Sequence, residues 1–192
     1  MIVKPDADRL AETARAAACE GKLPPVDKWN PPFCGDIDMR IARDGTWFYM
    51  GTPIGRAPLV RLFSTILKRE DGRYFLVTPV EKVGITVEDA PFIAVDFERA
   101  GEGAAQILTF VTNVGDRVAA GADHPIRVLR DAATGEPAPY VHVRGGLEAR
   151  IDRKSFYRLV EIGTVEPQDG QDWFGLRSGG AFFPVIPAAE LP

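Results

Sequence analysis

Residues 45–67 read GTWFYMGTPIGRAPLVRLFSTIL, and they predict an aromatic strand, a tight Gly/Pro connection and one amphipathic helix. The apolar residues of the second half follow the i, i+3, i+4, i+7, i+8 spacing of a helix that buries one face: Leu59, Leu62, Phe63, Ile66 and Leu67. Pro58 stands in the first helical turn, where proline is tolerated because the missing N–H has no helical partner there. We therefore expect a helix from Pro58 to Leu67 at the centre of the N-terminal half.

The composition is that of an ordinary globular protein. Of 192 residues, 45% are hydrophobic and 26% are charged. The net charge of −4 disfavours nucleic-acid binding, and no apolar run approaches the ~20 residues needed to cross a bilayer. Cys19 and Cys34 lack the spacing of a disulfide framework, so we expect free thiols and a cytoplasmic protein.

Many short elements are expected around the central helix, because the chain holds 19 glycines and 16 prolines. An alanine-rich helix is predicted at the start, followed by a proline-rich strap with Trp29 and Phe33 as anchors. The alanine face is small, so we expect this helix to be loosely docked and dispensable for folding. Predicted strands alternate polar and apolar residues or lie between turn signals, and they cover 36–41, 46–50, 74–78, 85–87, 93–97, 107–111, 126–129 and 140–143.

A second helix is predicted to begin at Asp152, whose side chain can cap its first turn, and to stop at Gly163. A hairpin across residues 178–180 follows it. The order strand, helix, hairpin at 46–80 thus returns at 147–185, which indicates a weak internal repeat.

The predicted fold class is α+β, with short antiparallel strands forming two curved sheets or rolls. Each sheet is packed with one helix, and the two halves are related by the weak repeat. The domain organisation that we expect has three parts: the alanine-rich helix at 1–22, an α+β domain at 23–86, and a mainly-β domain with one helix at 87–192.

Three segments carry a resemblance to a known family: CGDIDMRI at 34–41, GTPIGR at 51–56 and VTPVEKV at 77–83. Together with neighbouring residues they resemble an uncharacterised proteobacterial family titled domain of unknown function 1285. The resemblance covers roughly residues 23 to 187. It implies a two-domain α+β protein with repeated motifs and a place in signal transduction through small-molecule binding. It implies no catalytic residues.

Side chains with catalytic or metal-binding chemistry do not form a recognisable pattern. His124 and His142 are predicted in different segments, and neither neighbours a cysteine, so we expect structural or surface roles and no metal site. Asp36 and Asp38 share one strand face, which suits a cation or acid–base work. The alternative is that these carboxylates pair with arginines such as Arg40. No cofactor and no catalytic residue are predicted.

Arginine gathers near both predicted helices of an otherwise acidic chain, with seven Lys/Arg in 36–73 and seven in 127–158. A helix N-terminus with an arginine beside it suits an anion. We therefore predict a site for an anionic ligand from Trp47, Arg56, Arg61, Thr78, Glu81 and Lys82. Two alternatives stay open: the arginines form only surface salt bridges, or Arg56 pairs with Glu81 or Asp38.

The function predicted from the sequence is a regulatory or sensory module that binds a small anionic ligand. The alternatives are a protein–protein adaptor that meets a signalling protein, and an enzyme that uses carboxylates. The sequence does not identify the ligand, the partner or the oligomeric state.

Overall fold

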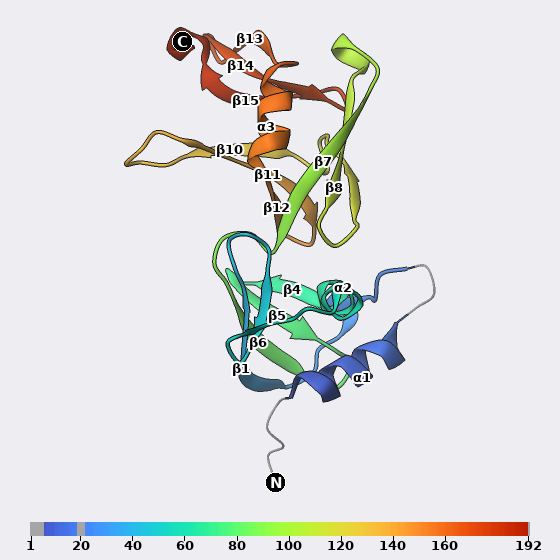
Figure 1. The fold of residues 1–192 in the computed structure, drawn as a ribbon. Helices are drawn as coiled ribbons and strands as arrows, with labels where there is room; N and C mark the ends of the chain where they lie inside the picture. Colours follow the sequence, from blue (N-terminus) through green and yellow to red (C-terminus); the bar gives the residue numbers. More distant parts are fainter. Residues whose placement is uncertain (1–5, 19–21, 192) are drawn as a thin grey trace. The chain divides into compact units, whose positions relative to one another are not determined.

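The computed structural model describes residues 6–18 and 22–191, and the chain divides into two compact units. The N-terminal unit is Met1–Pro91 and the C-terminal unit is Phe92–Pro192. The expected domain boundary at residue 86 falls within a strand of the N-terminal unit (Figure 1). Cys19 lies outside the described residues, and Cys34 is a half-buried free thiol.

The N-terminal unit holds two α-helices, a 3₁₀ turn and six strands among its described residues. In chain order they are α1 (Ala7–Ala17), η1 (Val26–Lys28), β1 (Phe33–Ile41), β2 (Trp47–Tyr49), β3 (Thr52–Pro53), α2 (Ala57–Thr65), β4 (Leu67–Glu70), β5 (Arg73–Val77) and β6 (Lys82–Val87). The strands form one sheet in the order β3-β2-β1-β6-β5-β4. Every pairing is antiparallel except the central one, where β1 and β6 run parallel. The sheet is therefore two three-stranded halves joined at a parallel pair.

Helix α2 lies against the sheet and supplies part of the core. Phe63 is completely buried and stacks on the equally buried Trp47 of β2, with 6.3 Å between ring centroids. The helix is shorter than predicted, because the Ser64 and Thr65 hydroxyls bond to carbonyls three residues back and compete with the helical ladder. Leu59 and Leu62 are only half-buried, while Ile66 and Leu67 reach the core from the end of the helix and from β4.

Helix α1 is docked more fully than its alanine content predicts. It lies next to α2 (Figure 1), and its inner face is buried: Ala7, Leu10, Ala11 and Ala14. Small side chains bury little area each, but they let the backbones of two helices approach closely. The phenol of Tyr49 also donates a hydrogen bond to Asp6 Oδ1 at 3.3 Å.

The C-terminal unit holds one α-helix, two 3₁₀ turns and nine strands among its described residues. They are β7 (Phe92–Ala100), η2 (Gly103–Ala105), β8 (Ile107–Thr112), β9 (Arg117–Ala119), β10 (Ile126–Arg130), β11 (Pro137–Arg144), β12 (Leu147–Ile151), α3 (Arg153–Val160), β13 (Thr164–Gln168), β14 (Gln171–Ser178), β15 (Ala181–Pro187) and η3 (Ala188–Glu190). Six strands form a sheet in the order β10-β11-β12-β7-β8-β9, and β13-β14-β15 form a second sheet. Again one central pair, β12 with β7, is parallel.

The two six-stranded sheets have the same topology. If the strands of each sheet are numbered from its own first strand, both orders read 3-2-1-6-5-4 or its reverse. The α+β class, the two curved sheets and the internal repeat are thus confirmed. The predicted residue alignment of the repeat, 46–80 with 147–185, is wrong. α2 follows the third strand of its sheet, whereas α3 follows the sixth.

The second six-stranded sheet must curl strongly because the connection between its two edge strands, β9 and β10, is short. Strands β9 and β10 lie at opposite edges, which in a flat sheet are five spacings of about 4.8 Å apart, roughly 24 Å. The connecting residues 120–125 could span that distance only if they were fully extended, at about 3.4 Å per residue. They are not extended, because the Gly121 N–H bonds to the His124 carbonyl. The edges must therefore approach one another.

The turn between β14 and β15 is attached to the six-stranded sheet through Ser178, which is completely buried. Its hydroxyl donates to the Ala120 carbonyl at 2.7 Å and accepts from the Leu108 N–H at 2.8 Å. Gly179 follows with φ 58°, and a Cβ there would lie 2.8 Å from the Ala120 carbonyl oxygen. Only glycine fits this approach of two backbones.

We predict that Phe63→Ala lowers the free energy of unfolding by about 3–5 kcal/mol, because a fully buried ring leaves a cavity. Leu62→Ala should cost clearly less, since that side chain is half-buried. Urea unfolding of both full-length variants measures the difference. Equal losses would contradict this account of the α2 face.

A second prediction compares two completely buried serines. Ser178→Ala strands a buried N–H and a carbonyl and should cost about 1–3 kcal/mol. The matched control is Ser155→Ala, whose hydroxyl has no hydrogen-bond partner among the described residues, so its removal should change stability little. The prediction fails if chemical denaturation finds the two variants equally stable.

Candidate functional site

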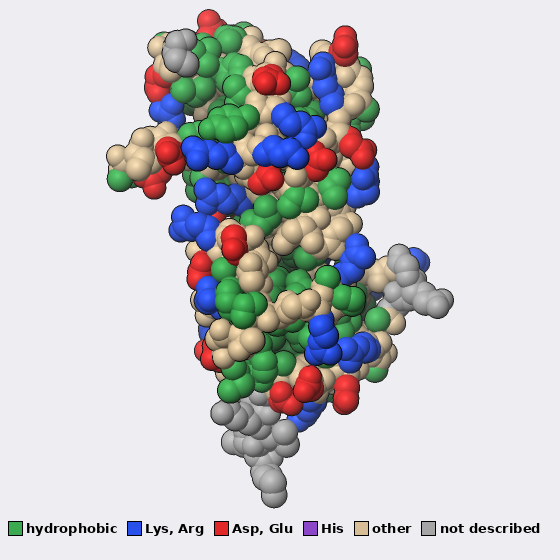
Figure 2. Space-filling model, in the orientation of Figure 1, with side chains coloured by type: hydrophobic (Ala, Val, Ile, Leu, Met, Phe, Trp, Pro, Cys, Tyr) green, Lys and Arg blue, Asp and Glu red, His purple; other side chains and the backbone are tan. Residues whose placement is uncertain are grey.

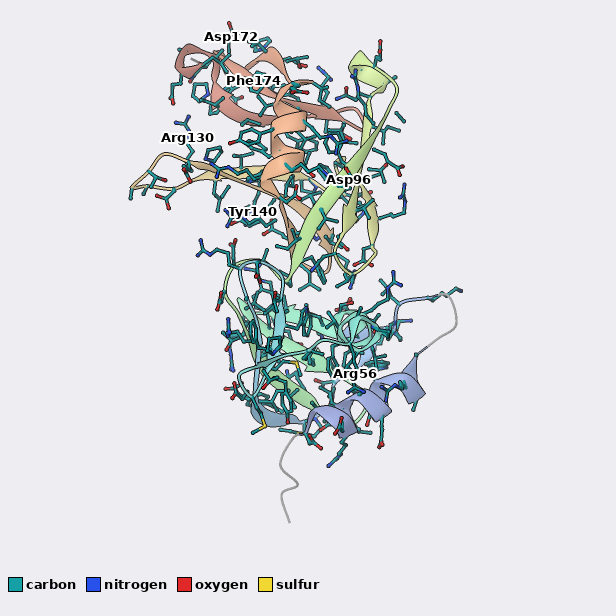
Figure 3. All side chains as sticks on the ribbon, viewed as in Figure 1. Arg56, Asp96, Arg130, Tyr140, Asp172 and Phe174 are labelled. Atoms are coloured by element: carbon teal, nitrogen blue, oxygen red, sulfur yellow. The ribbon has the colours of Figure 1, made fainter. Side chains whose placement is uncertain are left out.

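The predicted anion site begins at Arg56, which occupies the N-cap position of α2. Its exposed side chain lies at the start of the helix (Figure 3). The Arg56 side chain does not cap the first turn, and no acidic residue lies within this described turn. The partial positive charge of the helix end therefore faces solvent beside a guanidinium group.

The backbone donors at this helix end are fewer than predicted. The Arg56 carbonyl accepts from the N–H groups of both Leu59 and Val60, at 3.0 and 3.2 Å. Pro58 has no N–H to offer. Of the first three helical residues, Ala57 is thus the one whose backbone N–H can donate a hydrogen bond to a ligand.

Neither of the two predicted ion pairs of Arg56 is present in the described part of the chain. Glu81 instead faces Arg9 of α1, with 3.9 Å between Arg9 Nε and Glu81 Oε1. Arg61, one turn further along α2, is exposed. Arg56 is thus a solvent-facing cation without a carboxylate partner among the described residues.

Thr78 and Glu81 are brought together by the turn between β5 and β6, and both are buried. The Thr78 hydroxyl accepts from the Glu81 N–H at 3.2 Å, and the Thr78 N–H bonds to the Glu81 carbonyl at 2.9 Å. Glu81 Oε1 has no hydrogen-bond partner among the described residues. The turn therefore places a carboxylate inside the protein, close to α1.

Lys82 points to the other face of the sheet and belongs to a separate group. Its Nζ lies 2.8 Å from Glu70 Oε2, and Lys68 Nζ lies 2.9 Å from Glu70 Oε1. Hydrogen bonds from Lys82 and then Lys68 hold the pKa of the Glu70 carboxyl below its ordinary value. Lys82 also lies over the Phe75 ring at 5.0 Å.

The six predicted side chains therefore fall into four settings. Arg56 and Arg61 are exposed on α2, Thr78 and Glu81 are buried in the β5–β6 turn, and Lys82 is paired with Glu70. Trp47 is 1% exposed, and its Nε1 has no hydrogen-bond partner among the described residues. Sequence spacing placed these residues in one neighbourhood, but strand alternation sends successive side chains to opposite faces.

The arginines of residues 127–158 are largely engaged in ion pairs. Arg127 donates two hydrogen bonds to the Glu148 carboxylate, at 2.6 and 2.7 Å. Three further arginines form ion pairs with carboxylates: Arg130 with Glu190, Arg144 with Asp116, and Arg158 with Asp96. Figure 2 shows basic and acidic side chains interspersed over this unit. The Arg158 guanidinium and the Phe97 N–H hold the pKa of Asp96 below its usual range. These four arginines therefore form surface salt bridges, which was the alternative to an anion site.

Asp36, one of the two carboxylates considered for catalysis, is likewise engaged in an ion pair. Asp36 pairs with Arg73 at 2.8 Å, not with Arg40, which pairs with Glu88. Gly84 lies beneath the Asp36–Arg73 pair, and a Cβ there would meet Asp36 Oδ1 at 1.9 Å. Among the described residues, no three His, Cys, Asp or Glu side chains gather in a way that could hold a metal ion.

The sequence did not predict one contact between two side chains. His124 and His142 stack on each other with 5.7 Å between ring centroids. They come from the β9–β10 connection and from β11. No sequence spacing signals this contact, because it depends on the curling of the sheet.

Comparison with known proteins gives one consistent family. Residues 24–90 match the model described as "Domain of unknown function (DUF1285), N-terminal domain", and residues 91–185 match "Protein of unknown function (DUF1285), C-terminal domain". No curated protein matches the chain. Within the described residues, every helix is too short or too polar to cross a membrane.

Two solved structures are similar. A DUF1285 family protein from Silicibacter pomeroyi DSS-3 is 65% identical, with a TM-score of 0.85, over 94% of this chain and 96% of that one. Another, from Shewanella baltica OS155, is 33% identical, with a TM-score of 0.53, over 65% of this chain and 91% of that one.

We predict that Lys82→Met raises the pKa of Glu70 toward its ordinary value, 4.5, and that Lys68→Met does so less. Because the folded-state pKa is depressed, the stabilisation is present above the unfolded value and is lost as the pH falls through the folded one. NMR titration of the Glu70 carboxyl carbon measures both variants. An unchanged midpoint in Lys82→Met would contradict the assignment.

Proposed function

Because the chain belongs to the DUF1285 family, whose two domains it matches in order, we propose that it is a regulatory or sensory module that binds a small anionic ligand at Arg56. A role in signal transduction and a cytoplasmic setting are parts of this proposal, and the free thiol of Cys34 accords with such a setting. The proposal assigns no catalytic step to the chain.

The observation that carries the proposal is that Arg56 combines a guanidinium unpaired within the described residues with a helix N-terminus, whereas many other arginines are paired with carboxylates. Within the described part of the chain, ion pairs are seen for Arg9, Arg40, Arg73, Arg117, Arg127, Arg130, Arg144, Arg158 and Arg177. Arg56 has no carboxylate partner in the described part of the chain and stands at an uncapped helix end. A guanidinium beside a free N–H suits the oxygens of phosphate or carboxylate.

The ligand class follows from these donors. Arg56 offers two parallel N–H groups, and the Ala57 N–H adds a third donor along the helix axis. Three hydrogen-bond donors at an exposed site, with no buried surface to contact a larger ligand, suit a compact and strongly charged group such as a phosphate. Weak binding that declines with salt is expected, because exposed charges are screened by salt.

A protein partner is the second candidate, and one observation favours it. Phe33 and Val80 are 50% and 56% exposed. The Lys82 N–H bonds to the Pro32 carbonyl at 3.1 Å, so the two apolar side chains belong to adjacent segments at one end of β1 and β6. Exposed apolar side chains that gather in this way are typical of interaction surfaces. Such an interface would not depend on Arg56.

We predict that inorganic phosphate or pyrophosphate raises the Tm of the wild-type chain at constant ionic strength and that Arg56→Ala abolishes the shift. A ligand at ten times its Kd stabilises by about 1.4 kcal/mol, which corresponds to about 3–6 °C for a chain of this size. The matched control is Arg99→Ala, another exposed arginine without an ion pair among the described residues, and it should keep the shift.

Two results of this thermal-shift series would count against the proposal. One is the absence of any stabilisation of the wild-type chain by either anion. The other is a shift that survives in Arg56→Ala, because the anion would then bind elsewhere.

A further inference from the structure

Helix α3 turns one side to the sheets of its own unit and the other side to solvent. Ser155, Phe156 and Leu159 are buried, and the helix contacts β7 and β14. In Figure 1 it lies in front of the strands of the C-terminal unit, and no other described segment of that unit crosses over it. The outer side of α3 is therefore an exposed helix face, and its side chains decide what binds there.

The outer face of α3 is apolar at its centre. Tyr157 is 58% exposed, Val160 is 40% exposed, and Val165, just beyond the end of the helix, is 50% exposed. Arg153 orders the tyrosine, because its Nε donates to the Tyr157 hydroxyl at 3.1 Å and its guanidinium lies 5.8 Å from the centre of the ring. A side chain ordered in this way loses little freedom on binding, and tyrosine and arginine are enriched at protein interfaces.

Charged side chains lie at both ends of this face, in an order that does not suit the dipole of the helix. Arg153 and Lys154 are the first two residues of α3, and Glu161 is its C-cap; all three are exposed. Cations are unfavourable beside the N-terminus of a helix, and anions are unfavourable beside its C-terminus. The capping carboxylate of Asp152 partly offsets the two cations, but Glu161 has no ion pair among the described residues. The face thus has a positive end, an apolar centre and a negative end.

This order of charges makes the face complementary to itself when a second copy lies across it in the antiparallel direction. If the two helices meet at Tyr157, residues four positions before it in one copy lie level with residues four positions after it in the other. Arg153 and Lys154 of one copy then lie beside Glu161 of the second copy, and the same contact forms again at the opposite end. The helix dipoles also match, because the positive end of each helix lies beside the negative end of the other.

We propose that α3 forms the interface of a symmetric homodimer, in which two copies of the chain pack their α3 helices antiparallel with Tyr157 at the two-fold axis. Both copies use the same surface patch, as two-fold dimers do. A face of eight helical residues is small beside the roughly 800 Å² that each partner buries in a stable complex, so the dimer is weak and forms between about 10 µM and 1 mM. Salt weakens it further, because its end contacts join exposed charges. The dimer does not depend on a ligand at Arg56.

The test is sedimentation velocity of the full-length chain at low salt. The weight-average mass should rise from the 21.0 kDa of the monomer toward twice that value as the concentration is raised from about 10 µM to 1 mM. Glu161→Lys makes both end contacts repulsive and should abolish the rise. The double variant Arg153→Glu, Lys154→Glu should also abolish it, because all of its end charges are negative. The matched control is Glu102→Lys, an exposed position on the β7–β8 connection, which should associate as the wild type does.

A mixture of the two charge variants tests the antiparallel arrangement itself. Each variant repels its own copies, but the all-positive face of Glu161→Lys is complementary at both ends to the all-negative face of the double variant. An equimolar mixture should therefore form a heterodimer at concentrations where each variant alone stays monomeric.

Any of three results overturns the proposal: a wild-type chain that stays monomeric at about 1 mM, a Glu161→Lys variant that associates as the wild type does, or a mixture of folded charge variants that stays monomeric. The second result would place the contact between copies on another surface. If a charge variant does not fold, Tyr157→Ala decides in its place, because loss of the central ring should weaken association about tenfold or more.

Discussion

The parallel pairing of two central strands organises both halves of this protein. β1 runs beside β6 in one sheet, and β7 runs beside β12 in the other. Every other pairing is between antiparallel strands, which short turns can connect. A central parallel pair separates each sheet into two hairpin-connected halves. The chain must then pass from one outer edge of the sheet to the other, and this passage is where the two units differ.

In the N-terminal unit that passage is residues 54–66, which include α2. A helix has an apolar face to bury, and Phe63 buries it by stacking on Trp47. In the C-terminal unit the passage is six residues, too few for a helix of any length. It has no apolar face of its own, so it depends on directed polar contacts, namely the Ser178 hydroxyl and the two histidines. The same topology is thus closed by packing in one unit and by hydrogen bonds in the other.

The feature proposed to bind a ligand lies on one of these passages. Arg56 begins the helical passage and His124 lies in the short one. Segments that connect the halves of a rigid sheet are less constrained by strand pairing than the strands themselves, so their polar groups can be left available for other uses. Elsewhere the arginines and carboxylates neutralise one another in pairs along the strands.

The sequence alone determined the local elements, because a helix or a strand is decided by periodicity among residues close in the chain. The start of α2 beside Arg56, the capping of α3 by Asp152 and the strand at 36–41 were all predictable in this way. The family resemblance through GTPIGR and VTPVEKV was readable at the same level. Only the tertiary structure decided which strands pair in parallel, that Glu81 is buried near Arg9, and that His124 meets His142. Those contacts join segments far apart in the chain, and they depend on the curl of a sheet and on which face each side chain occupies, neither of which a local pattern encodes.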